Sequence, residues 1–411
     1  MSKKLVVIGG GAAGFFCAVN AARLQPGLEV ILLEKSSKLL SKVKVSGGGR
    51  CNVTHDCSSI AEMIKMYPRG AAFLKKAFHH FFTTDTVSWF EARAVKLKTE
   101  TDGRMFPVTD QSQTIIDCLL NEAAKYRVNI QMNVTVDSIN KNGNTWQIHA
   151  ANKIIEADYI CIAAGGFSKA SQFNWITNTG HSIENPVPSL FTFNIPGNSI
   201  KELMGISLEN VSVKIAGTKL QDNGPLLITH WGLSGPAILK LSAWGAKELS
   251  NKNYEFNIVV NWLPAFNETT LKIKFQEIRF NQASQKIINR NPFGLPSRLW
   301  EYFLTSTDVK EGIRWADLPA KEQNKLIKIL CAQEFSVKGK TTFKEEFVTA
   351  GGIRLNEIDV NTMESKMIPG LFFAGEIIDV DGVTGGYNFQ NAWTTGWIAA
   401  HGIIAKQSQT P

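Results

Sequence analysis

The sequence predicts an α/β protein whose parallel sheet is formed by both ends of the chain, with a separate region inserted between them. Three observations support this fold class: a strand–glycine–helix–strand pattern over residues 4–34, a buried-strand pattern at 158–164, and a strand followed by a helix over 370–404. The 411 residues, 44% of them hydrophobic, are enough for two or three domains. This composition excludes a disordered chain.

The first half of the chain alternates strands and helices. Residues 5–8 form a short apolar run that suits a buried parallel strand, and a helix over 12–24 follows the glycine cluster. The turn Pro26-Gly27 leads into a second strand at 29–34. Further elements are expected as a helix at 111–126 and strands at 128–132, 134–139, 145–150 and 158–164.

The pattern changes after about Pro186. Short β-like runs at 208–215, 224–229 and 255–260 give way to helices at 269–280 and 319–330, the second with a start signal in Asp317 and Pro319. Strands and glycine turns return near Lys338, and the chain closes with a strand-like segment at 370–375 and a helix at about 388–404. We therefore expect residues 1–190 and 346–411 to form one domain and 191–345 to be inserted into it.

The glycine cluster after the first strand satisfies the pattern G-x-G-x-x-G. Gly9 permits the tight turn, Gly11 lets the backbone approach a pyrophosphate, and Gly14 allows close packing of helix and strand. The helix that follows directs its first N–H groups toward phosphates. Glu34, twenty residues after Gly14 at the end of the second strand, can accept hydrogen bonds from a ribose diol. Together these features predict dinucleotide binding.

This pattern does not distinguish FAD from NAD, but the C-terminal end does. Gly375-Glu376 follow a strand, Asp379 and Asp381 come next, and residues 385–388 (Gly-Gly-Tyr-Asn) open the last helix. A flavoprotein needs such a second strand-to-helix junction to hold the ribityl chain and to face the N1–C2=O edge of the flavin, whereas a nicotinamide enzyme of this length would place its substrate domain here. Only one G-x-G-x-x-G is present, so a second Rossmann domain is not expected.

The chain resembles the BaiN-like (YhiN-type) bacterial flavoproteins, which are FAD-dependent oxidoreductases that use NAD(P)H. Four motifs in the same order carry this resemblance over nearly the whole chain, with Trp231 the one position that we do not assign to them: Gly47–Thr54 (GGGRCNVT), Thr229–Ala237 (THWGLSGPA), Val348–Gly352 (VTAGG) and Gly382–Gln390 (GVTGGYNFQ). The resemblance implies a glutathione-reductase-like FAD-binding Rossmann domain. It also implies that the insertion contains a small β-barrel, about 191–262, and a helical part, about 263–335.

The fingerprint, the C-terminal junction and the resemblance together give the expected site. We expect non-covalent FAD, with NAD(P)H as a transient electron donor, and we assign His230 and Thr349 as candidate catalytic residues. The expected cofactor-binding residues are Gly9, Gly11, Ala12, Ala13, Gly14, Glu34, Lys35, Lys42, Ser46, Gly48, Arg50, Cys51, Asn52, Val136, Ala164, Gly165, Gly375, Glu376, Asp381, Gly385, Gly386, Tyr387 and Asn388.

The loop expected at 35–52 has two interpretations. Its five cations in sixteen residues, 35–50, are typical of a solvated surface loop, or some of them flank the adenosine and pyrophosphate. The three successive glycines at 47–49 indicate a backbone that must approach something closely, and flavin is the partner that we prefer.

The cysteines raise a rival mechanism. Disulfide reductases of this fold carry a redox pair with four residues between the thiols, but five residues separate Cys51 from Cys57. Two unpaired thiols are therefore favoured over a dithiol relay. All six cysteines are scattered and no CxxC occurs, which fits reduced thiols in the cytoplasm.

His230 and Ser234 also permit more than one interpretation. A Ser–His hydrolase needs a G-x-S-x-G elbow, and the segment around Ser234 lacks the last glycine. A loop that closes over the flavin, with His230 as proton donor or hydrogen-bond partner, competes with a purely structural histidine. No metal is expected, because His55, His79 and His80 lack metal-ligand spacing with nearby acids.

Three classes of function remain open. The first is a flavin enzyme that transfers hydride through flavin N5 to an unsaturated or carbonyl-containing small molecule. The second is a flavin-containing protein associated with nucleic acid, prompted by the pI of about 9.0 and the net charge of +8; the cluster at 35–50 has no interleaved aromatics, which disfavours it. The third is a non-catalytic FAD-binding redox sensor.

The glycines at 9–11 interrupt the first apolar stretch and argue against a signal peptide, and no run is long enough to span a membrane. Substrate, choice of NADH or NADPH, and oligomeric state stay open.

Overall fold

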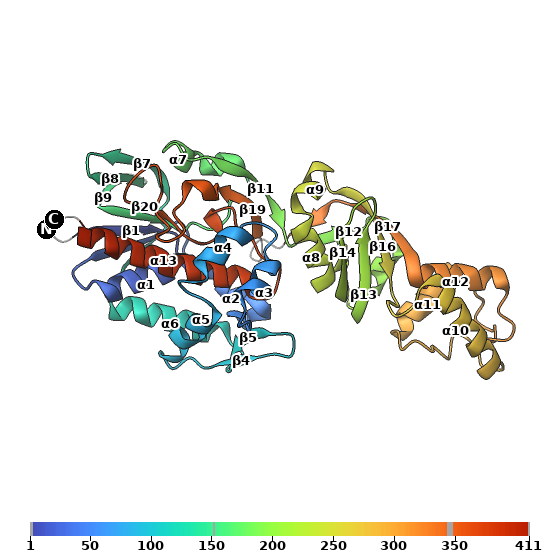
Figure 1. Ribbon diagram of the computed structural model, residues 1–411. Helices are drawn as coiled ribbons and strands as arrows, with labels where there is room; N and C mark the ends of the chain where they lie inside the picture. Colours follow the sequence, from blue (N-terminus) through green and yellow to red (C-terminus); the bar gives the residue numbers. More distant parts are fainter. Residues whose placement is uncertain (1–2, 151–152, 343–347, 410–411) are drawn as a thin grey trace. The chain divides into compact units, whose positions relative to one another are not determined.

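The computed structural model describes residues 3–150, 153–342 and 348–409 (Figure 1). The chain divides into two compact units. The first unit comprises Met1–Ser189 and Phe343–Pro411, and the second comprises Leu190–Thr342. Each is described by itself below.

The first unit is organised by a five-stranded parallel sheet of order β20-β10-β1-β2-β6. Its strands are β1 (Lys4–Ile8), β2 (Glu29–Glu34), β6 (Asn129–Met132), β10 (Tyr159–Ile162) and β20 (Leu371–Phe373). Strands β1, β10 and β20 are apolar and almost entirely buried, as expected for a parallel sheet covered on both faces. The α/β class and the first two strands predicted from the sequence are confirmed.

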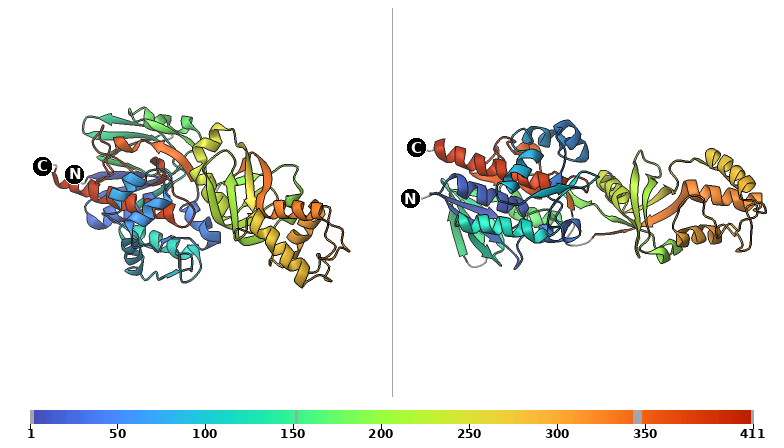
Figure 2. Two further views of the ribbon diagram at one scale, coloured as in Figure 1. Left: turned by 45° about the vertical axis from the view of Figure 1, so that its right-hand side comes forward. Right: turned by 90° about the horizontal axis from the view of Figure 1, so that it is seen from below.

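Helix α1 (Ala12–Leu24) is buried on nearly all sides. It packs against β1, β2 and β10 and also against α6 (Ser112–Lys125) and α13 (Tyr387–Gln409), and Figures 1 and 2 show α1 and α13 side by side. Gly396 of α13 makes this approach possible, since a Cβ there would stand 2.7 Å from the Ala13 carbonyl oxygen. The predicted helix at 12–24 therefore becomes the centre of the core because the last helix of the chain covers it.

A buried aromatic cluster joins α1 to more distant segments. Phe16 packs against Phe81, Trp89 and Trp393, with ring centroids 4.6–5.5 Å apart. Trp89 belongs to α5 (Thr83–Glu91), which follows α3 (Ile60–Met63) and α4 (Ala71–Ala77) in a stretch for which the sequence predicted no helix.

Smaller elements complete the first unit. Two three-stranded antiparallel sheets lie beside the main sheet: β3 (Thr54–His55), β5 (Arg104–Pro107) and β4 (Leu97–Thr99), and β7 (Val136–Asn142), β8 (Thr145–Ala150) and β9 (Lys153–Ala157). The short helix α7 (Asn174–Thr177) precedes β11 (Ile183–Ser189), which pairs with β19 (Val348–Ile353) with Ser189 opposite Val348.

The segment 35–52, expected as a loop, contains α2 (Ser41–Gly49). The backbone of the helix breaks at Ser46, and Gly47 and Gly48 adopt left-handed conformations with φ of 59° and 69°. The N–H of Leu40 donates to the Gly10 carbonyl, and the Ser112 hydroxyl donates to the Lys44 carbonyl. These tertiary bonds hold a helical turn that the charge pattern alone did not reveal.

The second unit is built on a seven-stranded antiparallel sheet of order β17-β16-β13-β14-β15-β12-β18. The strands are β12 (Thr192–Asn194), β13 (Ser207–Ile215), β14 (Gln221–Ile228), β15 (Gly232–Ser234), β16 (Glu255–Asn261), β17 (Gln333–Lys338) and β18 (Lys340–Thr341). Its helices are α8 (Pro236–Trp244), α9 (Ala246–Asn251), α10 (Glu268–Asn281), α11 (Ser297–Ser306) and α12 (Ala320–Ala332). Helices α8, α9 and α11 and strands β12 and β15 were not predicted. Strands β13, β14 and β16 and the two longest helices, α10 and α12, lie where the pattern placed them, within a few residues.

Candidate cofactor site

The carboxyl ends of the parallel strands bring most of the expected residues together. The segments that follow β1, β2, β10 and β20 begin at Gly9, Lys35, Ala163 and Ala374, and parallel strands end at one edge of a sheet. Contacts across this edge are close: a Cβ on Gly9 would overlap the Ala163 carbonyl, and one on Gly375 would stand 2.7 Å from the Ala13 side chain. In α/β sheets, ligands bind outside this edge.

The glycines at this edge fall into two kinds. Gly9 and Gly14 are tightly packed, since a Cβ on Gly14 would overlap the Gly9 carbonyl. At Gly11 and Gly165, by contrast, no described atom outside the neighbouring residues lies within 4 Å of where a Cβ would stand. Gly11 is also the N-cap of α1 and has no side chain to accept from the N–H groups of the first turn. This open, positively polarised helix end fits the phosphates of a dinucleotide.

Glu34 also holds the loop in place. Its carboxylate accepts from the backbone N–H groups of Gly10 and Ser36, both at 2.8 Å, one on each oxygen. Because a carboxylate oxygen accepts two hydrogen bonds, both oxygens keep capacity for ribose hydroxyls.

Lys42 and Glu376 join the two halves of the sequence. Lys42 Nζ lies 2.5 Å from Glu376 Oε2, and the N–H of Thr349 donates to Glu376 Oε1 at 2.8 Å. The Thr349 hydroxyl is buried and directed at the Phe167 carbonyl at 3.5 Å, while Lys35 lies over the Phe167 ring at 5.6 Å. The structure therefore places the candidate catalytic Thr349 in one cluster with three expected cofactor residues.

The polar side chains of the segment that leads into α13 form hydrogen bonds with other groups of the protein. Asp381 is completely buried, and both of its oxygens accept from Arg69, with a further bond from the Ser189 hydroxyl at 2.8 Å. Burial raises the pKa of Asp381, and the bonds from Arg69 and Ser189 act in the opposite direction. The amide of Asn388 exchanges two hydrogen bonds with the backbone of Gly382, at 2.8 and 2.9 Å.

Asn52 links this loop to the glycine-rich segment 46–52. Its side-chain oxygen accepts from the N–H of Gly386 at 2.9 Å and its amide nitrogen donates to the Thr54 carbonyl at 3.0 Å. A Cβ on Gly386 would stand 2.5 Å from the Thr54 oxygen, so this glycine is needed for protein packing. His55 donates from Nδ1 to the Gly385 carbonyl at 3.1 Å and stacks on Tyr387 with ring centroids 4.8 Å apart.

Within the glycine-rich segment, Gly48 is open in the same sense as Gly11, with no described atom near a Cβ. The Ser46 hydroxyl donates to the Val43 carbonyl, and Arg50 donates to Glu100 at 2.5 Å and lies over the Phe106 ring at 4.0 Å. Cys51 is fully buried, and burial raises the pKa of its thiol to about 12. A buried, protonated thiol is a poor nucleophile, which favours spectator thiols over a dithiol relay.

Two further expected residues, Val136 and His230, lie on other elements. Val136 is the first residue of β7, two positions after Val134, whose N–H donates to the Glu34 carbonyl at 2.9 Å. This brings Val136 to the neighbourhood of Glu34. His230 belongs to the second unit, on the exposed turn between β14 and β15, where its ring packs on Trp231 with centroids 4.7 Å apart.

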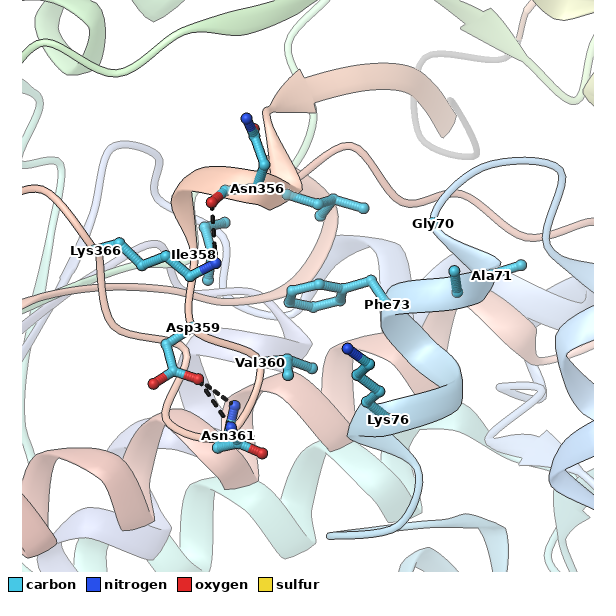
Figure 3. Close-up of a pocket in the computed structure, with 12 residues that line it drawn as sticks. Gly70, Ala71, Phe73, Lys76, Asn356, Ile358, Asp359, Val360, Asn361 and Lys366 are labelled. Carbon is cyan, nitrogen blue, oxygen red and sulfur yellow. Dashed lines mark hydrogen bonds between the residues drawn. The ribbon is translucent and has the colours of Figure 1, made fainter.

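A separate cavity of about 650 Å³ lies in the first unit between α4 and the segment 355–366. Figure 3 shows Phe73 pointing into it from α4, with Lys76 and Asp359 at its margins. None of the residues expected for FAD lines it. Asp359 accepts from the backbone N–H and the side-chain amide of Asn361, and Lys366 donates to the Asn356 carbonyl at 3.0 Å, so these polar groups already have partners within the segment 355–366.

Sequence reasoning missed Arg69, Gly166 and His55. Gly166 abuts both Thr349 and Glu376, so a side chain there would close the cluster; the Gly165-Gly166 pair after a strand was a signal for it. Arg69 and its partner Asp381 are 312 positions apart, and no local pattern marks the pair.

The fold and the open glycine edge define a class of protein: a Rossmann-type FAD-binding fold. Its solved neighbours include a 3-ketosteroid delta1-dehydrogenase from Sterolibacterium denitrificans (TM-score 0.55, 11% identity, 98% of this chain and 99% of that one). The quinol fumarate reductase of E. coli is another (TM-score 0.52, 14% identity, 100% and 71%). Residues 3–402 match the HI0933-like protein Rossmann domain family, and the chain belongs to that family. The resemblance found in the sequence is thereby confirmed.

Two named relatives align over almost the whole chain. The ribosomal RNA dihydrouridine synthase of Escherichia coli is 30% identical over 98% of both chains. The 3-dehydro-bile acid delta(4,6)-reductase of Clostridium scindens is 25% identical over 96% of this chain and 98% of its own. Along the described part of the chain, every helix is too short or too polar to cross a bilayer.

Proposed function

We propose that this protein is an FAD-dependent oxidoreductase that reduces a carbon–carbon double bond conjugated to a carbonyl group. The observation that carries the proposal is the open helix end at Gly11, on the carboxyl edge of the parallel sheet, with Glu34 beside it. Gly11 and the first turn of α1 would hold the pyrophosphate, Glu34 the adenosine ribose, and Gly48 and Gly165 would face the remainder of the cofactor. FAD would supply the capacity to accept and pass on a hydride.

We propose NAD(P)H as the electron donor. The overall reaction then balances: the substrate gains a hydride from the donor through the cofactor and a proton, and NAD(P)+ is released. In the first unit, Thr349, Glu376 and Lys42 form the side of the site where strand β19 begins and strand β20 ends. The charges of Lys42 and Glu376 cancel each other. Gly166 has no side chain, which leaves space beside Thr349 and Glu376.

The two named relatives favour this reaction class. Dihydrouridine is uridine whose C5–C6 double bond, conjugated to the C4 carbonyl, has been saturated; a delta(4,6)-reductase of a 3-keto steroid acts on double bonds conjugated to a ketone. Both substrates are electron-poor at the carbon that receives the hydride.

Of the two, a uracil base in RNA is the substrate that we put first. The relative named for ribosomal RNA is the more similar in sequence, and the second unit is basic, with 19 Lys and Arg against 13 Asp and Glu, a net charge of +6. This proposal reverses our sequence-based expectation of a small-molecule substrate without nucleic acid. A steroid-like enone is the second candidate, favoured by the bile acid reductase.

The experiment begins with the purified protein, which should be yellow and should release FAD on acid precipitation. Anaerobic mixing with NADH or NADPH should bleach the flavin absorbance near 450 nm. An unmodified ribosomal RNA transcript and a 3-keto-Δ4,6 steroid are then offered as acceptors, and products are identified by a mass gain of two hydrogens. A protein that binds no FAD, or whose bleached flavin reduces neither acceptor, would contradict the proposal.

The β-barrel expected for the second unit is part of the same proposal. Strand β17 pairs with β16 at one edge of the sheet, and across Gly339 the chain continues into β18, which pairs with β12 at the other edge. One chain segment thus serves both edges, which supports closure. A cytoplasmic location, expected from the scattered thiols, likewise remains a proposal.

A further inference from the structure

Three exposed apolar side chains of the second unit lie around one turn, the connection between β14 and β15, while Trp244, Ile273 and Phe280 are exposed on helices α8 and α10. Trp231 in this turn is 46% exposed, Leu227 on β14 is 37% exposed, and Met204 is 56% exposed. Met204 lies beside the turn because the N–H of the next residue, Gly205, donates to the Ile228 carbonyl at the end of β14. Exposed apolar groups clustered in this way mark a surface that binds something.

The turn is held rigidly from both sides. The Thr229 hydroxyl accepts from the N–H groups of Trp231 and Gly232 at 3.3 and 3.2 Å, and the N–H of Ile195 donates to the Trp231 carbonyl at 2.9 Å. The ring of the exposed His230 packs on Trp231. Trp231 therefore presents its indole from a fixed backbone, and little conformational entropy is lost when a flat ring stacks on it.

Three lysines lie on segments close to this turn. Gly232 pairs with Asn194 on β12, and the Asn194 N–H donates to the Gly339 carbonyl at 3.2 Å, so Lys338 and Lys340, on either side of Gly339, lie beyond β12 from the turn. Lys201 is one turn of chain before Met204, whose N–H donates to the Lys201 carbonyl. Lys201 and Lys338 form no ion pair with any residue in 3–150, 153–342 or 348–409. Glu202 follows Lys201 and Glu255 lies opposite Lys338 on β16, so the three lysines exceed the nearby acids by one charge.

We propose that the turn Thr229–Gly232 is a nucleobase-stacking site for single-stranded RNA, with Trp231 as the platform and Lys201 and Lys338 as phosphate contacts. An aromatic ring that is exposed, held from behind and flanked by cations is the arrangement by which proteins bind single strands. The inference rests on the proposed function, because it names the RNA substrate and the face that receives it. It assigns to His230 the role of a positioning residue that packs against the platform.

The full-length protein is tested with a fluorescently labelled twelve-nucleotide oligouridylate, and binding is followed by anisotropy. Trp231→Ala should weaken binding about tenfold, the effect typical of losing one stacked base, and Trp231→Phe should keep most of the affinity. The matched control is Trp244→Ala on α8, because Trp244 is also 46% exposed and lies away from the turn; it should bind like the wild type. Lys338→Gln should lower the salt slope of log Kd by about 0.7.

The contrary outcomes are distinct from those of the proposed function. The stacking site is wrong if oligouridylate does not bind, if Trp231→Ala binds as well as the wild type, or if Trp231→Ala and Trp244→Ala weaken binding equally. It is also wrong if the wild type sediments as a dimer and Trp231→Ala as a monomer, because a second copy would then cover the turn. Bleaching of bound FAD by NAD(P)H and the midpoint of urea unfolding should be unchanged in Trp231→Ala, so loss of the fold or of the cofactor is detected separately.

Discussion

The two glycine loops of the first unit look alike in sequence and differ in structure. The loop after β1, residues 9–14, presents Gly11 to open space at the uncapped end of α1. In the loop before α13, residues 379–388, the Gly386 N–H is taken by Asn52, Asn388 binds Gly382, and Asp381 is buried against Arg69. The first loop leaves the end of α1 open at Gly11, whereas the polar groups named in the second loop form hydrogen bonds within the protein.

This difference teaches what a glycine motif can and cannot mean. A glycine can be required because a ligand comes close or because another part of the protein does. The sequence does not distinguish these two kinds of glycine, but mutation of the apoprotein does. Replacing a glycine that packs against the protein lowers the stability of the apoprotein, whereas replacing one that faces the ligand does not. The experiments below apply this distinction.

The largest effect is expected at Arg69. Replacing it with Met keeps much of the side-chain volume and leaves the completely buried Asp381 without its main partner. We expect the free energy of unfolding of the apoprotein to fall by about 3–5 kcal/mol, measured by urea denaturation. The double variant Arg69→Met/Asp381→Asn is the control and should recover part of the loss. An Arg69→Met apoprotein as stable as the wild type would show that this loop is not held from within.

Gly386 and Gly11 give the direct contrast. Gly386→Val places a branched Cβ against the Thr54 carbonyl at a φ of 94°, so the apoprotein should lose about 3 kcal/mol of stability. Gly11→Val fits the apoprotein, with a change below about 1 kcal/mol for the poorer N-cap, but should weaken FAD binding at least about a hundredfold. Urea denaturation and flavin titration of each apoprotein separate the two effects, and equal losses of apoprotein stability would refute the contrast.

A smaller effect is expected at Glu34. Glu34→Ala removes the acceptor for the Gly10 and Ser36 N–H groups as well as the ribose contact, and leaves the helix end at Gly11 in place. FAD binding should weaken about tenfold, in line with about 1.4 kcal/mol for a lost charged acceptor. Glu34→Gln keeps one acceptor oxygen, so its affinity for FAD should lie between that of the wild type and that of Glu34→Ala. If Glu34→Ala were more damaging to FAD binding than Gly11→Val, the adenosine would lie elsewhere.

The smallest effect is expected at the thiols. Cys57→Ser should change neither turnover by more than about twofold nor stability by more than about 0.5 kcal/mol, because Cys57 is half-buried and its sulfur, among the residues that the structure describes, donates only to the Ser59 carbonyl. Native protein treated with iodoacetamide at pH 8 should be alkylated at Cys57 and spared at Cys51. The Cys51 thiol has a pKa of about 12 and stays protonated at pH 8, so it reacts only after unfolding. Collapse of turnover in Cys57→Ser would restore the dithiol mechanism.

Much of the fold was accessible from the sequence because its signals are local. The helix at 12–24 and the strand at 29–34 lie at the predicted residues, since apolar periodicity and glycine turns act over neighbouring positions. The helix within 35–52 was missed because bonds from Gly10 and Ser112 stabilise it. Helices α3–α5 were missed as well; the aromatic cluster that buries α5 needs Phe16 and Trp393 from opposite ends of the chain.

The same limit applies to the site. Gly11 and Glu34 could be predicted as cofactor residues because a motif fixes both their spacing and their chemistry, and this assignment stays a prediction. The hydrogen-bond partners of Asp381, Gly386 and Glu376 could not be predicted. Each partner lies more than 180 positions away in the sequence or is brought near by the path of a loop. A sequence pattern does not indicate which polar groups already form hydrogen bonds within the protein.

The packing of α13 on α1 also sets the order in which the protein can mature. On the ribosome the N-terminal segment emerges first, yet the helix that covers α1 is the last to be synthesised. Between them the second unit, whose residues 190–342 are continuous in sequence, can fold as soon as it leaves the exit tunnel. The apolar surface of α1 therefore stays uncovered until α13 has been synthesised, after the whole of the second unit. The proposed FAD site is likewise completed only after the second unit, because β20 and Gly375 follow it in sequence.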